Sequence, residues 1–270
     1  MPRLPTIAGY LRTSARSIWR AGVDFIYERS CPSCHRELPD VDPADRGGPR
    51  LCDPCAAELA PPVQYACDRC GAPVGPYLDT SDGCIHCRQE SFAFNRAIAL
   101  GAYDGALRLA ALAIKQPDGA PLAAAVADLF WQRSELELRN LVADVVVAVP
   151  HHWIVRLARG HNPAETLAAV LASRLGLPFA RRWLRKIRHT PSQTSLTYTE
   201  RRANLRGAFR AQRTRRLAGR RVLLVDDVLT TGTTAHRATR ELLKAGAAAV
   251  VVAVVARGIG RAGGGGGGAP

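Results

Sequence analysis

The sequence predicts an α/β protein with a doubly wound parallel sheet, preceded by a small cysteine-rich domain. Apolar runs such as 145–149 and 222–225 indicate strands that are buried on both faces, as strands of parallel sheets usually are. From residue 95 onward these runs alternate with helical patterns, which favours repeated strand–helix units. All eight cysteines come earlier, between Cys31 and Cys87. A chain of 270 residues is long enough for one α/β core and one smaller domain.

The composition divides the chain into four segments. Residues 1–27 carry apolar side chains at helical spacing and arginines on another row, which predicts an amphipathic helix. Docking on the body of the protein is the favoured role for this helix, and a membrane surface or nucleic acid is the alternative. Residues 28–92 hold the cysteines, and residues 93–258 hold the alternating strands and helices. Residues 259–270 include six consecutive glycines, which predicts a flexible tail.

The cysteines form four C-x-x-C pairs, which are Cys31/Cys34, Cys52/Cys55, Cys67/Cys70 and Cys84/Cys87. Seventeen residues separate the first two pairs, and thirteen separate the last two. Two such pairs typically converge on one tetrahedral zinc ion, so a double zinc ribbon with two structural zinc ions is predicted. A sequential grouping of the pairs is the natural one, although an interleaved grouping also supplies four thiolates per ion. A disulfide framework would need an oxidising compartment.

Local patterns give the expected elements of the α/β part. Asn162, Pro163 and Glu165 form an N-cap, a first-turn proline and a capping-box acid, so a helix begins there, and it ends at Gly176. The polar segment 189–197 has no hydrophobic period. The expected strands are 98–103, 145–149, 179–187, 222–225 and, as the last strand of the sheet, 250–256, and the other expected helices are 106–115, 120–140 and one that ends near residue 245.

The segment from Val222 to Ala235 carries the most specific chemistry. Its apolar strand leads into two adjacent acids, Asp226 and Asp227, and a loop of threonines around Gly232 then opens a helix. Backbone N–H groups at a helix start can hold a phosphate, and carboxylates accept hydrogen bonds from sugar hydroxyls. The pattern therefore predicts a ribose 5-phosphate site. One alternative is a Walker B strand, which needs a Gly-Lys loop that the chain lacks, and another is an ordinary turn with solvated acids.

This segment resembles the phosphoribosyl-diphosphate (PRPP) signature of type I phosphoribosyltransferases. Four further segments extend the likeness, and they follow one another along the chain: Ile114-Lys115, Arg159-Gly-His-Asn162, Arg188 to Gln193 and Arg201 to Asn204. Together with the cysteine-rich segment, this set resembles the ComF family, the competence protein F-like phosphoribosyltransferases, over roughly residues 28–257. The family usually reads R-G-F-N-Q at Arg159 to Pro163. This chain has His161 in place of the aromatic residue and Pro163 in place of the glutamine, so any role of that glutamine is not carried over to this chain.

The resemblance implies a type I phosphoribosyltransferase-like fold and an enzyme that transfers a ribosyl 5-phosphate from PRPP to an unidentified acceptor. It implies that Asp226 and Asp227 are catalytic and hold the ribose hydroxyls, directly or through Mg²⁺. A lid carrying Thr190 and Gln193 would close over the site. The other residues implied in PRPP binding are Val228, Leu229, Thr230, Thr231, Gly232, Thr233 and Thr234 around the 5-phosphate, and Lys115, Arg159 and Arg188 at the diphosphate.

One position limits the acceptor. Enzymes of this fold that act on 6-oxopurines usually carry an acid three or four residues after the acidic pair, where it exchanges a proton with the base. Here Thr230 and Thr231 occupy those positions, and neither has a suitable pKa. We therefore expect no hypoxanthine–guanine activity, while orotate-type, adenine-type and non-nucleobase acceptors stay open.

The net charge of +14 is concentrated in one stretch. Residues 181–221 contain fourteen Arg or Lys and one acid, a net charge of +13, which favours polyanions. The alternative function is a non-catalytic, single-stranded DNA-binding factor of natural transformation, with Arg201, Arg202 and Arg206 as contacts, whereas a solvated basic face is the plainer interpretation. The resemblance adds the competence helicase and DNA-processing proteins as partners. The chain has no apolar run long enough for a membrane span and no secretory signal, so a cytoplasmic protein is expected.

Overall fold

The computed structural model describes residues 30–39, 48–61, 65–152, 160–188, 205, 207–212 and 215–259. The amphipathic helix expected within residues 1–27 lies outside the described residues, as does the glycine-rich tail beyond Ile259. None of the helices in the described part combines the length and the apolar character that crossing a bilayer requires.

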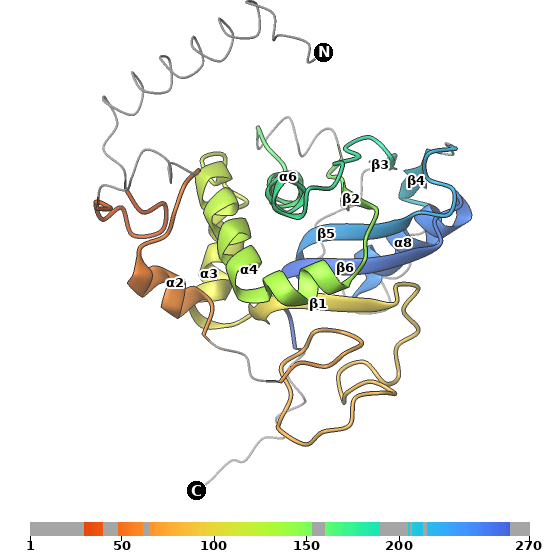
Figure 1. The fold of residues 1–270 in the computed structure, drawn as a ribbon, viewed down its shortest axis with the longest axis horizontal. Helices are drawn as coiled ribbons and strands as arrows, with labels where there is room; N and C mark the ends of the chain where they lie inside the picture. Colours follow the sequence, from red (N-terminus) through yellow and green to blue (C-terminus); the bar gives the residue numbers. More distant parts are fainter. Residues whose placement is uncertain are drawn as a thin grey trace, which may run out of the picture.

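The central sheet has four parallel strands in the order β1-β6-β5-β2 (Figure 1). Their bounds are Arg96–Ala102 for β1, Val145–Ala148 for β2, Arg221–Leu229 for β5 and Ala249–Arg257 for β6. Leu223 and Val225 face one core cluster and Val222 and Leu224 face the other, so β5 is buried on both sides as its apolar run predicts. The last strand, β6, lies in the interior of the sheet, between β1 and β5.

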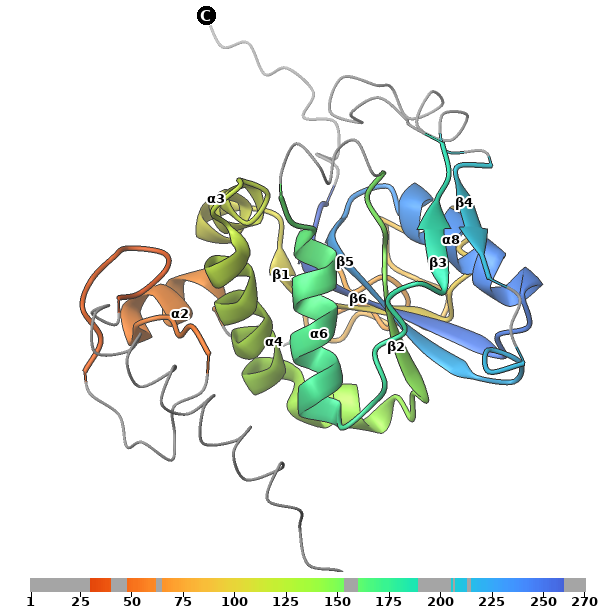
Figure 2. The ribbon, with the colours of Figure 1, turned by 90° about the horizontal axis from the view of Figure 1, so that it is seen from above.

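Helices cover both faces of this sheet. On one face, α3 (Gly105–Ala113), α4 (Ala120–Asn140) and α6 (Pro163–Leu175) form a core with the strands. On the other face, α8 (Thr233–Lys244) packs beside a small sheet (Figure 2). The start of α6 is the predicted one, because the Asn162 side chain accepts a hydrogen bond from the N–H of Ala164 at 3.2 Å. Its end is also confirmed, since Gly176 adopts a left-handed conformation with φ of 68°.

The expectation of one strand over residues 179–187 is wrong, because these residues are divided between two sheets. Phe179 forms one parallel bridge with Val146 at the edge of the central sheet. The chain then turns, and β3 (Leu184–Lys186) pairs antiparallel with β4 (Phe209–Ala211) in a separate two-stranded sheet. The turn is closed by a hydrogen bond from the N–H of Trp183 to the carbonyl of Ala180. A continuous apolar and basic run therefore serves two sheets.

The cysteine-rich segment contacts the α/β part at two places. A short helix, α2 (Asp53–Leu59), contributes Leu59 to the core that contains Leu107 of α3. The later cysteines lie beside the edge strand β1, where the N–H of Ala97 donates to the carbonyl of Arg69 at 3.2 Å (Figure 1). The cysteine-rich segment is thus attached to the sheet by both apolar packing and backbone hydrogen bonds.

Candidate functional site

The two acids of the motif lie within β5, which continues to Leu229. Asp226 is buried, with 7% of its surface exposed, and 13% of the Asp227 side chain is exposed. The N–H of Asp227 donates to Oδ1 of Asp226 at 2.9 Å, and the N–H of Val228 donates to Oδ1 of Asp227 at 2.7 Å. These short contacts to their own backbone fix both carboxylates, so the acids form a rigid pair near the carboxyl end of the strand.

Lys115, which follows α3, pairs with the second of these acids. Its Nζ lies 3.0 Å from Oδ2 of Asp227. Burial opposes the ionisation of Asp227, but the charges of Lys115 and His151 outweigh it and lower the pKa of this carboxyl. Burial and repulsion from Asp227 instead raise the pKa of Asp226 well above its ordinary value. The neighbouring acids therefore differ in character, because the pKa of Asp227 lies below its ordinary value and the pKa of Asp226 lies above it.

Lys186 is a site residue that the sequence analysis missed. It lies on β3 with its Nζ 5.9 Å from the centre of the Phe209 ring, and it is close enough to Asp226 to sense its charge. Burial lowers the pKa of Lys186, and the attraction of Asp226 only partly offsets this effect. The alternation of buried Leu184, exposed Arg185 and half-buried Lys186 is the signal that could have directed attention to this side chain.

The loop between β5 and α8 has the form of a phosphate cradle. Gly232 caps α8 in a left-handed conformation with φ of 72°, which costs glycine little. The first N–H groups of a helix have no backbone partner within the helix, so the start of α8 is the kind of place where an anion can bind. The hydroxyls of Thr231 and Thr233 are 2.9 Å apart, and the N–H of Thr233 donates to Oγ1 of Thr231 at 3.4 Å. Hydrogen bonds between its own residues therefore hold the conformation of the loop.

A buried arginine at the end of β6, also missed from sequence, supports this loop. Arg257 is 2% exposed, and its Nη1 donates to the carbonyls of Leu229 at 3.1 Å, Thr230 at 2.5 Å and Gly258. The same contacts place a positive charge beneath the loop. The side chain of Leu229 is buried in the core, so this residue offers the loop only its backbone.

The turn before α6 joins the Lys115 side of the site. A ring nitrogen of His161 lies 2.8 Å from the carbonyl oxygen of Ile114. The side-chain amide of Asn162 donates to the carbonyl of Val149 at 3.2 Å and so ties the turn to the end of β2. His161 thus holds this turn against the residue before Lys115, although it departs from the family pattern.

Several predicted site residues are not tested. Arg188 is exposed at the end of β3. The residues Arg159, Thr190, Gln193, Arg201, Arg202 and Arg206 lie outside the described residues.

The comparisons with known proteins agree with this geometry. Residues 118–263 match the model of the phosphoribosyl transferase domain, which is more than half of the chain. The DNA utilization protein YhgH of Salmonella typhi is 31% identical over 205 residues, which cover 73% of this chain and 86% of that protein. Competence protein F of Haemophilus influenzae is 27% identical, over 73% of this chain and 85% of that protein.

The chain belongs to the ComF family of phosphoribosyltransferase-like proteins. Among solved structures, the glutamine PRPP amidotransferase of B. subtilis is 26% identical over 51% of this chain, with a TM-score of 0.33. That match spans 27% of the amidotransferase chain.

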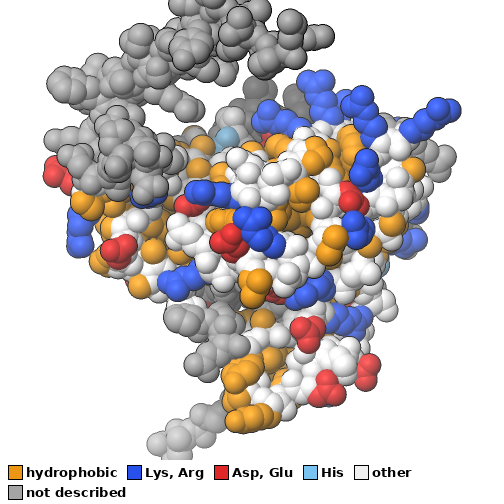
Figure 3. All heavy atoms as spheres, viewed as in Figure 1, with side chains coloured by type: hydrophobic (Ala, Val, Ile, Leu, Met, Phe, Trp, Pro, Cys, Tyr) orange, Lys and Arg blue, Asp and Glu red, His pale blue; other side chains and the backbone are white. Residues whose placement is uncertain are grey.

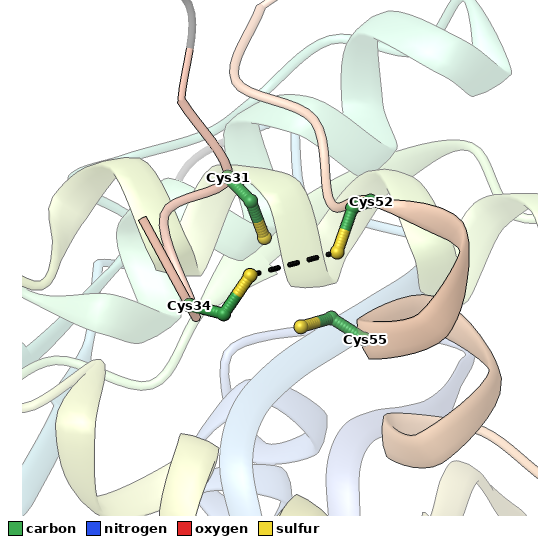
Figure 4. A group of neighbouring side chains, drawn as sticks. All are labelled: Cys31, Cys34, Cys52 and Cys55. Carbon is green, nitrogen blue, oxygen red and sulfur yellow. Dashed lines mark hydrogen bonds between the residues drawn. The ribbon is translucent and has the colours of Figure 1, made fainter. Parts of the chain in front are cut away.

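In this ComF-family protein the eight cysteines gather into two tetrads, so the sequential grouping is the one observed. The first tetrad is Cys31, Cys34, Cys52 and Cys55 (Figure 4), and the second tetrad is Cys67, Cys70, Cys84 and Cys87. Within each tetrad the sulfur atoms all lie within 4.8 Å of one another.

The spacing of the sulfur atoms suits a tetrahedral ion. The sulfurs of Cys34 and Cys52 are 3.6 Å apart, and those of Cys70 and Cys84 are 3.7 Å apart. A tetrahedron of thiolates at the usual Zn–S distance has edges of about 3.8 Å. Each tetrad could therefore hold one zinc ion, with four thiolates and no open position.

Proposed function

We propose that this protein binds PRPP and transfers its ribosyl 5-phosphate to an acceptor other than a 6-oxopurine. The observation that carries this proposal is the order of groups along the end of β5 and the start of α8. A charged carboxylate beside Lys115 is followed, within seven residues, by an ordered helix-start loop around Gly232. A sugar hydroxyl is recognised by a carboxylate that accepts its hydrogen bond, and a phosphate by the N–H groups of a helix start.

The proposed reaction is a displacement at C1 of the ribose. A nucleophile on the acceptor forms a bond to C1 as the bond from C1 to the diphosphate oxygen breaks, and diphosphate leaves with the electron pair. Asp226 and Asp227 accept hydrogen bonds from the ring hydroxyls and favour the positive charge that develops on the sugar. The loop around Gly232 holds the 5-phosphate, so the sugar is fixed at both ends and only C1 moves.

Cations are needed at the other end of PRPP. Lys115 pairs with Asp227, Lys186 lies within electrostatic reach of Asp226, and these two cations would meet the diphosphate. Two carboxylates beside a substrate diphosphate are the donor set that Mg²⁺ prefers, so Asp226 and Asp227 would hold this ion together with the substrate. Mg²⁺ would supply neutralisation of the leaving group's charge. Zinc in the two tetrads has a structural role in this proposal.

Calorimetric titration with PRPP and Mg²⁺ tests the proposal. The wild-type protein is expected to release heat on binding, and Asp226→Asn/Asp227→Asn to lose it. Glu241→Gln is the matched control, because it removes a half-buried carboxylate of α8 that forms an ion pair with Lys244. An absence of heat with wild type, or equal heat with the double variant, would overturn the assignment.

A specific observation favours a second function, the binding of single-stranded DNA. Arg185 of β3 lies directly opposite Arg210 of β4, and both are exposed. Like charges opposite each other weaken a strand pair, so this arrangement costs stability unless an anion lies between them. Arg and Lys side chains gather over this end of the molecule (Figure 3). Further exposed arginines that are close to the pair in sequence include Arg181, Arg182, Arg188, Arg215 and Arg216. We infer a nucleic-acid surface here, with partners in DNA processing.

A further inference from the structure

One arginine connects the second tetrad to the sheet and to the segment that follows the tetrad. Arg69 lies between the first two cysteines of the second tetrad, and its carbonyl accepts from the N–H of Ala97 on β1 at 3.2 Å. Its guanidinium donates to the carbonyl of Cys87 at 3.2 Å and to that of Glu90. The geometry of the cysteine knuckles therefore determines where the chain leaves the second tetrad.

Phe92 lies between the second tetrad and the phosphate loop. Its ring packs against the cluster of tetrad cysteines, stacks on Phe94 at 4.6 Å, and has the Arg69 guanidinium 5.7 Å from its centre. The ring atoms Cδ1, Cε1 and Cζ lie against Gly232. A Cβ atom at Gly232 would lie 2.5 Å from Cε1 of Phe92. The ring is thus in direct contact with the backbone of the loop at its left-handed residue.

A second contact runs beside the first. The N–H of Ala93 donates to Nδ1 of His236 in the first turn of α8, at 3.1 Å. Beside these two contacts is a small hollow that is open to solvent and is lined by Ser91, Thr231, Thr233 and Arg237 among others. The segment that leaves the second tetrad therefore touches both the turning point of the loop and the helix whose N–H groups would bind the phosphate.

Glycine at the turning point makes this support necessary. Glycine has more backbone freedom than any other residue type. Without support, the loop around Gly232 would therefore leave its left-handed conformation for part of the time. A rigid aromatic ring against its Cα limits that freedom without adding a bond. The ring is itself held by Arg69 and the tetrad, and a bound metal would hold the four thiolates in place.

We propose that the second tetrad, loaded with its metal, positions the phosphate loop through Phe92, so that its metal occupancy sets the affinity for the 5-phosphate end of the ligand. Phe92 and Arg69 are positioning residues in this scheme. The first tetrad, attached through α2, has no such role. This inference rests on the proposed PRPP site, but its central claim concerns the loop and can be measured without a ligand.

Hydrogen exchange of the ligand-free, zinc-loaded protein tests the coupling itself. Amides of residues 230–236 are expected to exchange faster in Phe92→Ala and in Cys84→Ser, while amides of β2 keep their wild-type rates. Cys34→Ser is the matched control in the first tetrad, and Tyr77→Ala is the control for a fully exposed aromatic in the same segment. Unchanged exchange in the loop of Phe92→Ala overturns the proposal, whether or not the protein binds PRPP.

Ligand titrations separate positioning from general damage. Phe92→Ala is expected to weaken ribose 5-phosphate on the order of tenfold, the scale of ordering one loop, and to leave inorganic diphosphate unchanged. Phe92→Leu, which keeps an apolar side chain against Gly232, is expected to recover most of the affinity. Equal losses for both ligands, or no recovery with leucine, overturn the proposal. If Phe92→Ala does not fold, Arg69→Ala takes its place with the same expected pattern. If the wild-type protein does not bind ribose 5-phosphate, the proposed PRPP site is refuted. The hydrogen-exchange experiment then still decides whether Phe92 couples the second tetrad to the loop.

Discussion

The ammonium of Lys115 lies 3.0 Å from a carboxylate oxygen of Asp227. The lysine follows α3 and the acid belongs to β5, so the fold brings together two residues that are distant in sequence. Nothing in the sequence motif distinguishes Asp226 from Asp227. The contact with Lys115 distinguishes them, because only Asp227 has this ion pair among the described contacts. Lys115 favours the charged form of Asp227, and Asp226 is left as the buried neighbour of a charge.

Replacing Lys115 is expected to affect one end of the ligand. Lys115→Gln should weaken inorganic diphosphate and PRPP by about 10–100-fold, the scale of one charge-assisted hydrogen bond, and should spare ribose 5-phosphate. Calorimetric titration of the three ligands measures this pattern. Lys244→Gln, which removes an exposed lysine of α8, is the control. Equal weakening of all three ligands would show that Lys115 only supports the fold of the site.

The buried acid predicts a pH-dependent stability. The pKa of Asp226 is raised, so the folded state binds a proton that the unfolded state has released above its own pKa of about 3.9. This contribution favours folding below that value and is lost as pH rises through the folded pKa. Asp226→Asn should therefore raise the melting temperature at pH 7 by about 2–4 °C per kcal/mol gained, and the gain should vanish near pH 4.

Thermal melts of wild type and Asp226→Asn across this pH range measure the effect. Asp227→Asn provides the opposite sign, because the pKa of Asp227 is lowered and its contribution is present above the unfolded pKa and lost as pH falls. If the melting temperatures of Asp226→Asn and Asp227→Asn changed with pH in the same way, the opposite pKa shifts of the two acids would be contradicted. Greater stability with loss of binding in Asp226→Asn would also mark this acid as one kept for function.

The turning point of the loop should not tolerate a side chain. Gly232→Ala places a Cβ atom against Phe92 and forces alanine to a φ of 72°, so binding of ribose 5-phosphate should be lost. In Gly232→Ala/Phe92→Ala the collision is relieved but the backbone cost of about 1–2 kcal/mol is not. A double-mutant cycle of unfolding free energies separates these two costs. Strictly additive free energies would mean that the ring does not touch the glycine.

The parts of the site that the sequence predicts are those whose chemistry is local. Asp226 to Thr234 are consecutive, so strand, acids and helix start follow from one stretch of pattern. The cysteine tetrads follow from ligand spacing, because a C-x-x-C pair can present two thiolates to one ion wherever the chain goes next. The spacing leaves open which pairs share an ion, and the structure shows the sequential grouping.

The missed residues act through tertiary contacts. Arg257 reaches the loop only because β6 lies beside β5, and no local pattern states that order of strands. Lys186 comes within electrostatic reach of Asp226 because the chain leaves the central sheet after Phe179 and forms the β3–β4 pair. Phe92 lies in a segment without periodicity, and its importance becomes visible only when Gly232 is found against its ring. Strand order and long-range packing are the information that single-sequence patterns lack.

Metal content should follow the two tetrads. Purified protein is expected to hold two zinc ions per chain, and Cys34→Ser and Cys84→Ser should each hold one, because three thiolates bind zinc far less tightly than four. Metal analysis of the gel-filtered proteins gives the count. A loss of both ions from either variant would show that the tetrads fold as one unit, and retention of both would contradict the ligand sets.

The arginine pair on β3 and β4 predicts a strand pair that is less stable than it could be. Arg185→Ala/Arg210→Ala removes two like charges that lie opposite each other, so folding should be unharmed or stabilised by about 0.2–1 kcal/mol. The same change should weaken single-stranded DNA binding and reduce the slope of log K against log salt by about 1.4, since each phosphate contact contributes roughly 0.7. Filter binding at several salt concentrations measures the slope.

The controls for this prediction distinguish a surface from a net charge. Arg108→Ala/Arg133→Ala removes two exposed arginines from α3 and α4, and the slope should stay at its wild-type value. Equal slopes in both double variants would mean that the protein attracts DNA only through its overall charge. If Arg185→Ala/Arg210→Ala stabilises the strand pair and also reduces salt-dependent DNA binding, packing alone does not explain the result. That combination would show that the arginines are retained for an anionic partner.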